Sequence, residues 1–168
     1  TCALPIYVSF MQGKEYTGIE RAIGTAGLAA GKFQPSQMEI FKSMINFQTV
    51  YNEMFLSYAT SAQKDMYNAS LTEKHSIDVA NMQKIILAGG LKGQLHEIDA
   101  VTWFKTISRK MDALKKIEDS LSRETLMRME LVRNTALQHL TSAISIVGIS
   151  LLGTFLFAFL AVRSVNAS

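Results

Sequence analysis

Apolar residues recur at intervals of three or four along most of the chain, a spacing that predicts amphipathic α-helices. The first such run covers about residues 4–30, and its second half is rich in glycine and alanine, which let a neighbouring helix approach closely. Gly31 is typical of a helix end, and Pro35 is typical of the first turn of the following helix. The apolar and small residues at helical spacing in this run are Leu4, Tyr7, Val8, Met11, Gly18, Ala22, Ala26 and Ala29.

Two further helices are predicted between Pro35 and the glycine pair at residues 89–90. The second covers about residues 36–68. The third begins at Ser70, because Ser70 and Glu73 have the spacing of a capping box, and it ends at the glycine pair, a clear stop signal. One position in the apolar stripe of the second helix is polar, namely Gln48. That stripe consists of Phe41, Met44, Gln48, Tyr51, Phe55, Ala59, Ala62 and Met66.

A long last helix is predicted after a connecting loop at residues 89–98. Asp99 has the position of its N-cap. No proline or glycine interrupts the chain from Val101 to Val147, so one continuous rod is expected to run from the bundle into a membrane. The apolar stripe of this helix consists of Phe104, Ile107, Met111, Leu114, Ile117 and Leu121.

Residues 140–162 read as a transmembrane helix. No formally charged residue other than His139 lies between Arg133 and Arg163. At about 1.5 Å per residue the segment is long enough to cross a hydrocarbon core of about 30 Å. The alternative is a buried helix of a large soluble protein, but the chain offers too few partner helices to cover it. The predicted fold is therefore all-α, an antiparallel helical bundle whose long last helix continues into a transmembrane span.

Composition narrows the possible functions. The formal net charge is +3, from 17 basic and 14 acidic residues that alternate along the chain, which is too weak for a nucleic-acid-binding protein. A single cysteine, Cys2, excludes an internal disulfide. The three histidines lie on different segments, and no phosphate-binding loop or nucleophile motif is present. We therefore expect neither an enzyme nor a bound metal or cofactor.

Arg21 and Gln48 are the candidate ligand-binding residues. Gly18, Ala22 and Gly24 surround Arg21, and small neighbours allow a guanidinium to be sheltered between helices, where its planar fork suits an oxyanion. The alternative is a structural ion pair of Arg21 with Glu20 or with a carboxylate on a facing helix. Gln48 is expected to bond an opposing helix or to approach the ligand, because a buried amide requires a partner.

Three motifs occur in an order that resembles the second half of the nitrate- and nitrite-sensing domain of bacterial chemoreceptors and other membrane signalling proteins. They read KEYTGIERAIG, FQTVYNEMF and WFKTISRKMDALKKIE, and the resemblance covers about residues 1–120. The matching residues are Lys14, Glu15, Gly18, Glu20, Arg21, Ala22, Gln48, Tyr51, Phe55, Trp103, Phe104, Thr106, Asp112, Leu114 and Glu118.

The resemblance implies an extracytoplasmic helical sensor that binds nitrate or nitrite between helices through arginines from both halves of the domain. Arg21 matches the second-half arginine, and the first-half arginine would lie upstream of Thr1. The implied organisation places the second half of the sensor at residues 1–120 and a juxtamembrane continuation of the helix at 121–139. The transmembrane helix at 140–162 and the start of a truncated cytoplasmic region at 163–168 would follow.

The resemblance further implies a receptor of the bacterial inner membrane, most simply a methyl-accepting chemotaxis protein, in which a helix displacement carries the signal to a cytoplasmic module. We expect a homodimer, and we expect the chain to be the middle of a longer protein. A count of positive charges alone would place the N-terminal part in the cytoplasm, because Arg123, Arg128 and Arg133 precede the span and only Arg163 follows it. We expect the flank after Arg163 to be truncated, so charge counting leaves the orientation open. The alternative function is a membrane-anchored helical scaffold or oligomerisation module without a small-molecule ligand.

Overall fold

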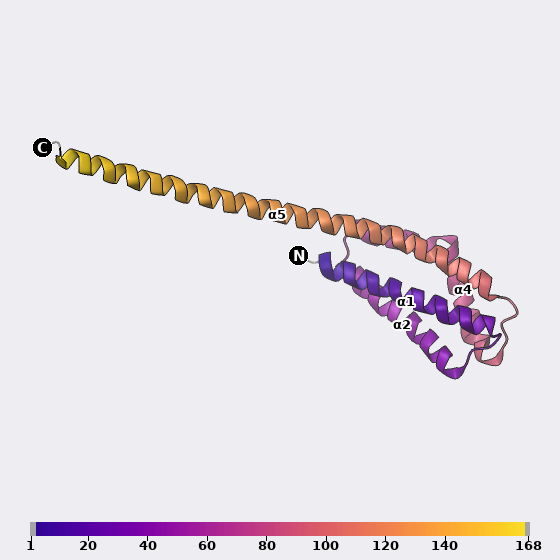
Figure 1. The fold of residues 1–168 in the computed structure, drawn as a ribbon. Helices are drawn as coiled ribbons and strands as arrows, with labels where there is room; N and C mark the ends of the chain where they lie inside the picture. Colours follow the sequence, from indigo (N-terminus) through magenta and orange to yellow (C-terminus); the bar gives the residue numbers. More distant parts are fainter. Residues whose placement is uncertain (1–2, 167–168) are drawn as a thin grey trace. The chain divides into compact units, whose positions relative to one another are not determined.

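The computed structural model describes the backbone of residues 3–166 and the side chains of residues 4–155 and of Arg163. This part of the chain is helical and contains no strand, as the sequence predicts (Figure 1). The chain forms two compact units, Thr1–Thr125 and Leu126–Ser168, named here the bundle unit and the C-terminal unit. The elements are α1 (Ala3–Ala29), α2 (Pro35–Tyr58), α3 (Ser61–Thr72), α4 (Lys74–Gly89), the 3-10 turn η1 (Gly90–Lys92) and α5 (Ala100–Asn166).

The turn between α1 and α2 forms as predicted. Gly31 has a φ of 70°, the left-handed conformation that glycine adopts without strain, and Pro35 is the first residue of α2. Phe33 anchors the turn, since its side chain is fully buried and its backbone N–H donates to the carbonyl of Gly90 at 2.9 Å. α1 and α2 therefore lie side by side and run in opposite directions (Figure 1).

The single helix predicted at residues 36–68 is wrong, because the chain breaks between α2 and α3. Ala59 is extended, and Thr60 caps α3: its hydroxyl accepts from the backbone of Gln63 at 3.3 Å, and the Gln63 side chain accepts from the backbone of Thr60 at 2.9 Å. This reciprocal capping box starts a new helix with a new phase. Ala62 and Met66 are consequently exposed, and Gln63 and Tyr67 are buried in their place.

The capping box predicted at Ser70 and Glu73 is also wrong. Ser70 lies inside α3, where its hydroxyl donates to the carbonyl of Tyr67 at 2.6 Å, and Glu73 is the N-cap of α4 without a side-chain bond. Ser76 donates to the carbonyl of Ser70 at 2.7 Å, so the end of α3 is satisfied from α4. The predicted stop is confirmed, since α4 ends at Gly89.

α5 begins as predicted. Asp99 Oδ1 accepts hydrogen bonds from the backbone of Val101 and of Thr102, both at 2.9 Å. These bonds satisfy N–H groups that a helix start leaves without partners. A hydrogen bond from the Thr102 hydroxyl and these backbone bonds lower the pKa of Asp99. The predicted stripe is wrong at its first member, because Trp103 is fully buried and Phe104 is 47% exposed.

Two apolar clusters fill the bundle unit. One is built around Phe41 and Trp103, and the other around Phe10, Phe55 and Tyr67. Several residues in the run predicted for the first helix are exposed, namely Leu4, Val8, Ala22, Ala26 and Ala29. The face that α1 buries instead carries Ile6, Ser9, Phe10, Thr17, Glu20 and Leu28. Apolar periodicity does not predict this face because its middle is polar.

The glycines of α1 permit close packing, against aromatic side chains. A Cβ on Gly24 would lie 2.5 Å from the Trp103 indole, and one on Gly27 would lie 2.4 Å from the Phe33 ring. Both distances are far below van der Waals contact. These two positions therefore fix how near α1 comes to the side chains of the first cluster.

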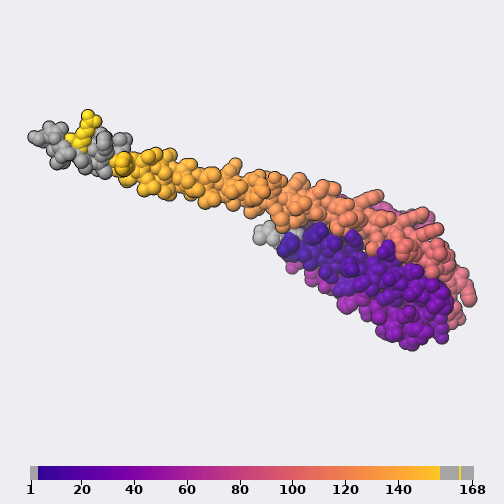
Figure 2. All heavy atoms as spheres, in the orientation of Figure 1, coloured from indigo at the N-terminus to yellow at the C-terminus, as the bar shows by residue number. Residues whose placement is uncertain are grey.

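α5 continues without interruption through the C-terminal unit (Figure 2). The exposed side chains of this unit are mixed up to His139 and mostly apolar from Leu140 to Phe155. Among the described residues, one helix, Ala100–Phe155, is long and apolar enough to cross a bilayer. Its most apolar stretch of 18 residues has a mean hydropathy of 1.4, and none of that stretch is buried. Ser145 and Thr154 hydrogen-bond to the carbonyls of Thr141 and Ser150, at 2.9 and 3.1 Å, as a helix in lipid requires. The side chains of residues 156–162 in the predicted span, and residues 167–168, lie outside the described part.

Candidate functional site

A network of polar side chains occupies the interior of the bundle unit. Thr17 Oγ1 donates to Gln48 Oε1 at 2.9 Å, and Gln48 Nε2 donates to Glu20 Oε2 at 2.8 Å. The other carboxylate oxygen of Glu20 accepts from Gln83 Nε2 at 2.7 Å. Thr17 and Glu20 lie on α1, Gln48 on α2 and Gln83 on α4, so one network joins three helices. Glu20 is fully buried.

Glu20 is electrostatically coupled to Lys110 on α5. Burial raises the pKa of Glu20, an effect that the charge of Lys110 and the two amide hydrogen bonds reduce. Burial lowers the pKa of Lys110, and the charge of Glu20 opposes that shift. Both shifts arise because removal from water disfavours the charged form. In the described part of the chain, the Lys110 ammonium makes no hydrogen bond.

A cavity of about 70 Å³ adjoins this network, and its lining residues come from all five α-helices. Its apolar wall comes from the second apolar cluster and includes Phe10, Tyr67 and Leu114. None of the residues that line it is acidic. Its polar wall consists of Lys14, Thr17, Gln48, Asn52, Ser70, Ser76 and Lys110.

The two lysines of this wall differ in their counter-charges. Lys14 forms an ion pair with Glu118, a buried residue of α5, which also accepts a hydrogen bond from Lys115 at 3.0 Å. Burial alone would raise the pKa of Glu118, but the hydrogen bonds from the two lysines outweigh it and lower the pKa. Glu118 is therefore a carboxylate at neutral pH and compensates Lys14, whereas Lys110 has no carboxylate in hydrogen-bond contact.

Arg21 lies half-buried between α1 and α5. Its Nη1 donates to Ser108 Oγ at 3.0 Å, and its guanidinium carbon stands 4.9 Å from the ring centroid of Phe104. The backbone carbonyl of Arg21 accepts from the Trp103 indole at 3.1 Å. These contacts hold both the backbone and the head of the arginine against α5.

The structural ion pair considered for Arg21 is not observed. Among the ion pairs of the described residues none involves Arg21, and Glu20 uses both carboxylate oxygens elsewhere. Arg21 and Gln48 also have separate partners. Gln48 belongs to the buried network and the cavity wall, and Arg21 belongs to the surface between α1 and α5.

Sequence reasoning named neither Glu20 nor Lys110 as a site residue, and it did not find the cavity that Lys110 lines. A signal for both residues exists in the register of the buried positions. Along α5 these positions are Trp103, Ile107, Leu114 and Ile117, and Lys110 falls between them at the same spacing of three and four. Likewise, Glu20 lies on the buried face of α1, at a position where an apolar residue is usual. Charged residues in a core register therefore marked the site.

The arrangement is suited to holding a small polar molecule by hydrogen bonds. It offers an ammonium group, hydroxyls and amides around an enclosed space. The described residues contain no group of His, Cys, Asp or Glu side chains that could hold a metal ion. The fold and the site therefore place the protein in the class of all-α bundle domains with a polar interior, in which ligand sites lie between the helices.

The chain belongs to the nitrate and nitrite sensing family, whose profile matches residues 3–126. It is also 26% identical over 113 residues to the nitrate regulatory protein of Klebsiella oxytoca. That alignment covers 67% of this chain and 28% of the relative, so the chain spans about a quarter of the relative's length. No solved structure matches the chain. The family is one of sensing and signalling domains, and the resemblance of the three sequence motifs is confirmed.

Proposed function

We propose that this chain is the extracytoplasmic sensor region of a bacterial transmembrane signalling receptor, of the methyl-accepting chemotaxis class, which responds to nitrate or nitrite. Family membership supports the ligand class, and the apolar stretch of α5 supports a membrane anchor in the bacterial inner membrane. The observation that carries the proposal is Arg21, a fixed guanidinium without a carboxylate partner among the described residues.

Arg21 has the properties of one side of an oxyanion site. A guanidinium has five N–H donors, and the hydrogen bond to Ser108 uses one of them. Phe104 packs against the guanidinium and limits its hydration, which strengthens a charge-assisted hydrogen bond to an incoming anion. An arginine from the other half of the sensor would complete the site. Gln48 is the second proposed ligand-binding residue; it lies apart from Arg21, in the cavity wall, where it also donates to Glu20.

Signal transmission follows from the residues that Arg21 touches. Ser108 and Phe104 both lie on α5, so an anion that draws the guanidinium changes contacts between α1 and α5. α5 continues without a break into the apolar segment. A small displacement of α5 would then pass through the membrane to a cytoplasmic module, in a receptor that acts as a homodimer.

Calorimetric titration of nitrate and nitrite into the complete receptor tests the role of Arg21. Arg21→Lys keeps the charge but loses the planar fork, and we expect weaker binding. Arg21→Ala removes a charge-assisted bond of about 1.5–3 kcal/mol, so the affinity should fall about 10- to 100-fold. Arg109→Ala, at an exposed position of α5, is the matched control. A folded Arg21→Ala receptor that binds both anions like the parent contradicts the assignment.

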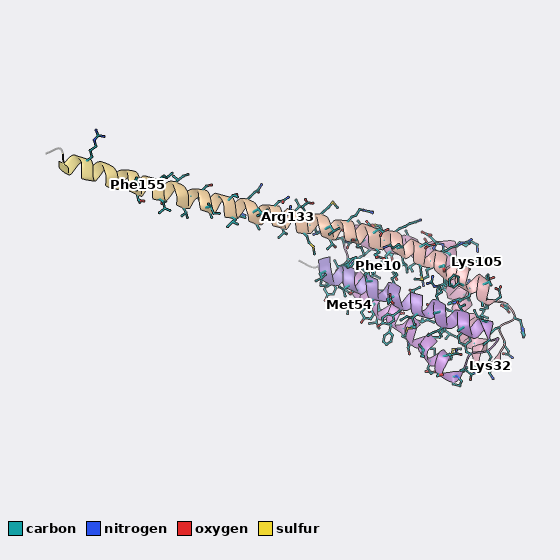
Figure 3. All side chains as sticks on the ribbon, viewed as in Figure 1. Phe10, Lys32, Met54, Lys105, Arg133 and Phe155 are labelled. Atoms are coloured by element: carbon teal, nitrogen blue, oxygen red, sulfur yellow. The ribbon has the colours of Figure 1, made fainter. Side chains whose placement is uncertain are left out.

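A second function, an oligomerisation module without a small ligand, is favoured by one observation. Large apolar side chains are exposed along α2, where Met54 projects outward (Figure 3). Phe47, Val50 and Tyr58 are 42, 53 and 55% exposed. Sedimentation of the complete protein with and without nitrate separates the two functions. A stable dimer whose titration with either anion gives no heat supports the module.

A further inference from the structure

The cavity of the bundle unit has a composition that an apolar packing defect does not have. Its volume of about 70 Å³ exceeds what one water molecule needs, about 10–15 Å³ by the same kind of measure. It therefore has room for a cluster of water molecules or for an anion of three or four atoms. Amides and hydroxyls line it beside two lysines, and no carboxylate does.

Lys110 is the residue of the cavity wall best placed to bind an anion. Its side chain lines the cavity, and its ammonium makes no hydrogen bond to the described residues. Glu20 acts on it electrostatically but is not part of the cavity wall, and both of its oxygens already accept hydrogen bonds. An ammonium has three donors, so Lys110 has hydrogen bonds available for an anion in the cavity.

The rest of the cavity wall also offers polar groups to an occupant. Asn52 supplies an amide, and Asn52 Oδ1 lies 2.8 Å from where a Cβ on Gly13 would be, so the glycine makes room for this side chain. Lys14 adds a positive charge that Glu118 already compensates. Among the described residues, the wall thus presents one ammonium that makes no hydrogen bond to a carboxylate, that of Lys110, together with neutral amides and hydroxyls.

We propose that this cavity is a second anion site, in which Lys110 binds a monovalent oxyanion of three or four atoms, nitrate or nitrite. The inference rests on the proposed function for the identity of the anion. The site is separate from Arg21, whose partners Ser108 and Phe104 do not line the cavity. It lies wholly within the bundle unit of this chain, whereas the Arg21 site is shared with another half of the sensor.

Calorimetric titration of sodium nitrate into the complete protein in nanodiscs tests the second site. We expect two anions per chain in the parent and one in Lys110→Met, a variant of similar side-chain length without charge. Lys105→Met is the matched control, because Lys105 lies on the same helix and projects into solvent (Figure 3). A folded Lys110→Met protein with the parent's stoichiometry and affinity overturns the proposal.

The outcomes separate this site from the Arg21 site. Loss of binding in Arg21→Ala with the parent's behaviour in Lys110→Met overturns the second site and supports the proposed function. The reverse result supports the second site and overturns the Arg21 assignment. Nuclear magnetic resonance of isotope-labelled lysine in the unmodified protein gives an answer even where Lys110→Met does not fold. Nitrate should shift the Lys110 ammonium resonance and leave that of Lys105 unchanged, and an unshifted Lys110 resonance means that water alone fills the cavity.

Discussion

At the scale of single residues, some buried positions of the bundle unit are occupied by polar groups that hydrogen-bond one another. Gln48 connects Thr17 to Glu20, and its amide N–H₂ also donates to the carbonyl of Met44 at 3.2 Å. Every polar atom of this amide therefore has a partner. The hydrogen bonds of such a buried group add little to the free energy of unfolding. Removing one partner lowers this free energy much more, because it leaves a buried polar atom unsatisfied.

Gln48→Leu should lower the free energy of unfolding by about 1–3 kcal/mol, because it leaves Glu20 Oε2 without its amide partner. Urea unfolding of the complete sensor measures this change, and Gln12→Leu at an exposed position of α1 is the control. Lower stability with unchanged nitrate affinity identifies Gln48 as a structural residue. Unchanged stability with lost affinity identifies it as a ligand residue.

Glu20 should make stability depend on pH. Burial raises its pKa above the ordinary 4.5, so the folded state holds the proton more tightly than the unfolded state. The contribution of Glu20 to stability is therefore complete below pH 4.5 and is lost as the pH rises through the folded-state pKa. Urea unfolding of the parent and of Glu20→Gln from pH 4 to 8 measures it. The stability of the parent relative to the variant should fall over this range, and a constant difference contradicts the assignment.

At the scale of elements, local capping decides where the helices begin. Asp99 and Gly31 carry strong signals of their own, and both were predictable. Thr60 and Gln63 form the box that the sequence equally offered at Ser70 and Glu73. Ser70 does not cap a helix, because its hydroxyl donates to the carbonyl of Tyr67 within α3. This hydrogen bond could not be read from the sequence.

Two glycines of α1 offer opposite tests of helix packing. Gly24→Ala should destabilise the bundle by about 1–3 kcal/mol, because its Cβ would lie 2.5 Å from the fully buried Trp103 indole. Gly18→Ala should stabilise it by up to about 1 kcal/mol through helix propensity. Its Cβ would lie 3.4 Å from the flexible end of Met111, an ordinary contact. Thermal unfolding of both variants checks the pair, and equal effects would refute the packing described for Trp103.

The all-α fold, the turn at Gly31, the start of α5 and the family resemblance were thus all accessible from the sequence. The buried face of α1 was not, because apolar periodicity points away from Thr17 and Glu20. Arg21 and Gln48 were found as candidates from their neighbours. Lys110 was missed because a lysine in an amphipathic helix is ordinarily solvated, and only three-dimensional packing places it at a cavity.

At the scale of the whole molecule, the proposed topology places the bundle unit outside the cytoplasm and the end of α5 inside. Lys116→Cys, at an exposed position of α5, and Ser164→Cys provide reporters in a Cys2→Ser background. A membrane-impermeant thiol reagent added to intact cells should label the first and spare the second. Labelling of Ser164→Cys alone, or equal labelling of both, contradicts the orientation.

The polar network that centres on Glu20 limits how the bundle can rearrange. It takes hydrogen-bonding groups from α1, α2 and α4 and a facing charge from α5. Sliding α1 or α2 by a single residue, about 1.5 Å, would break at least two of these bonds at once. Intermediate positions of α1 and α2 are therefore costly. The bundle is accordingly suited to two-state switching, in which each molecule adopts one of two discrete packings. A graded output of the receptor would then reflect the fraction of molecules in each packing.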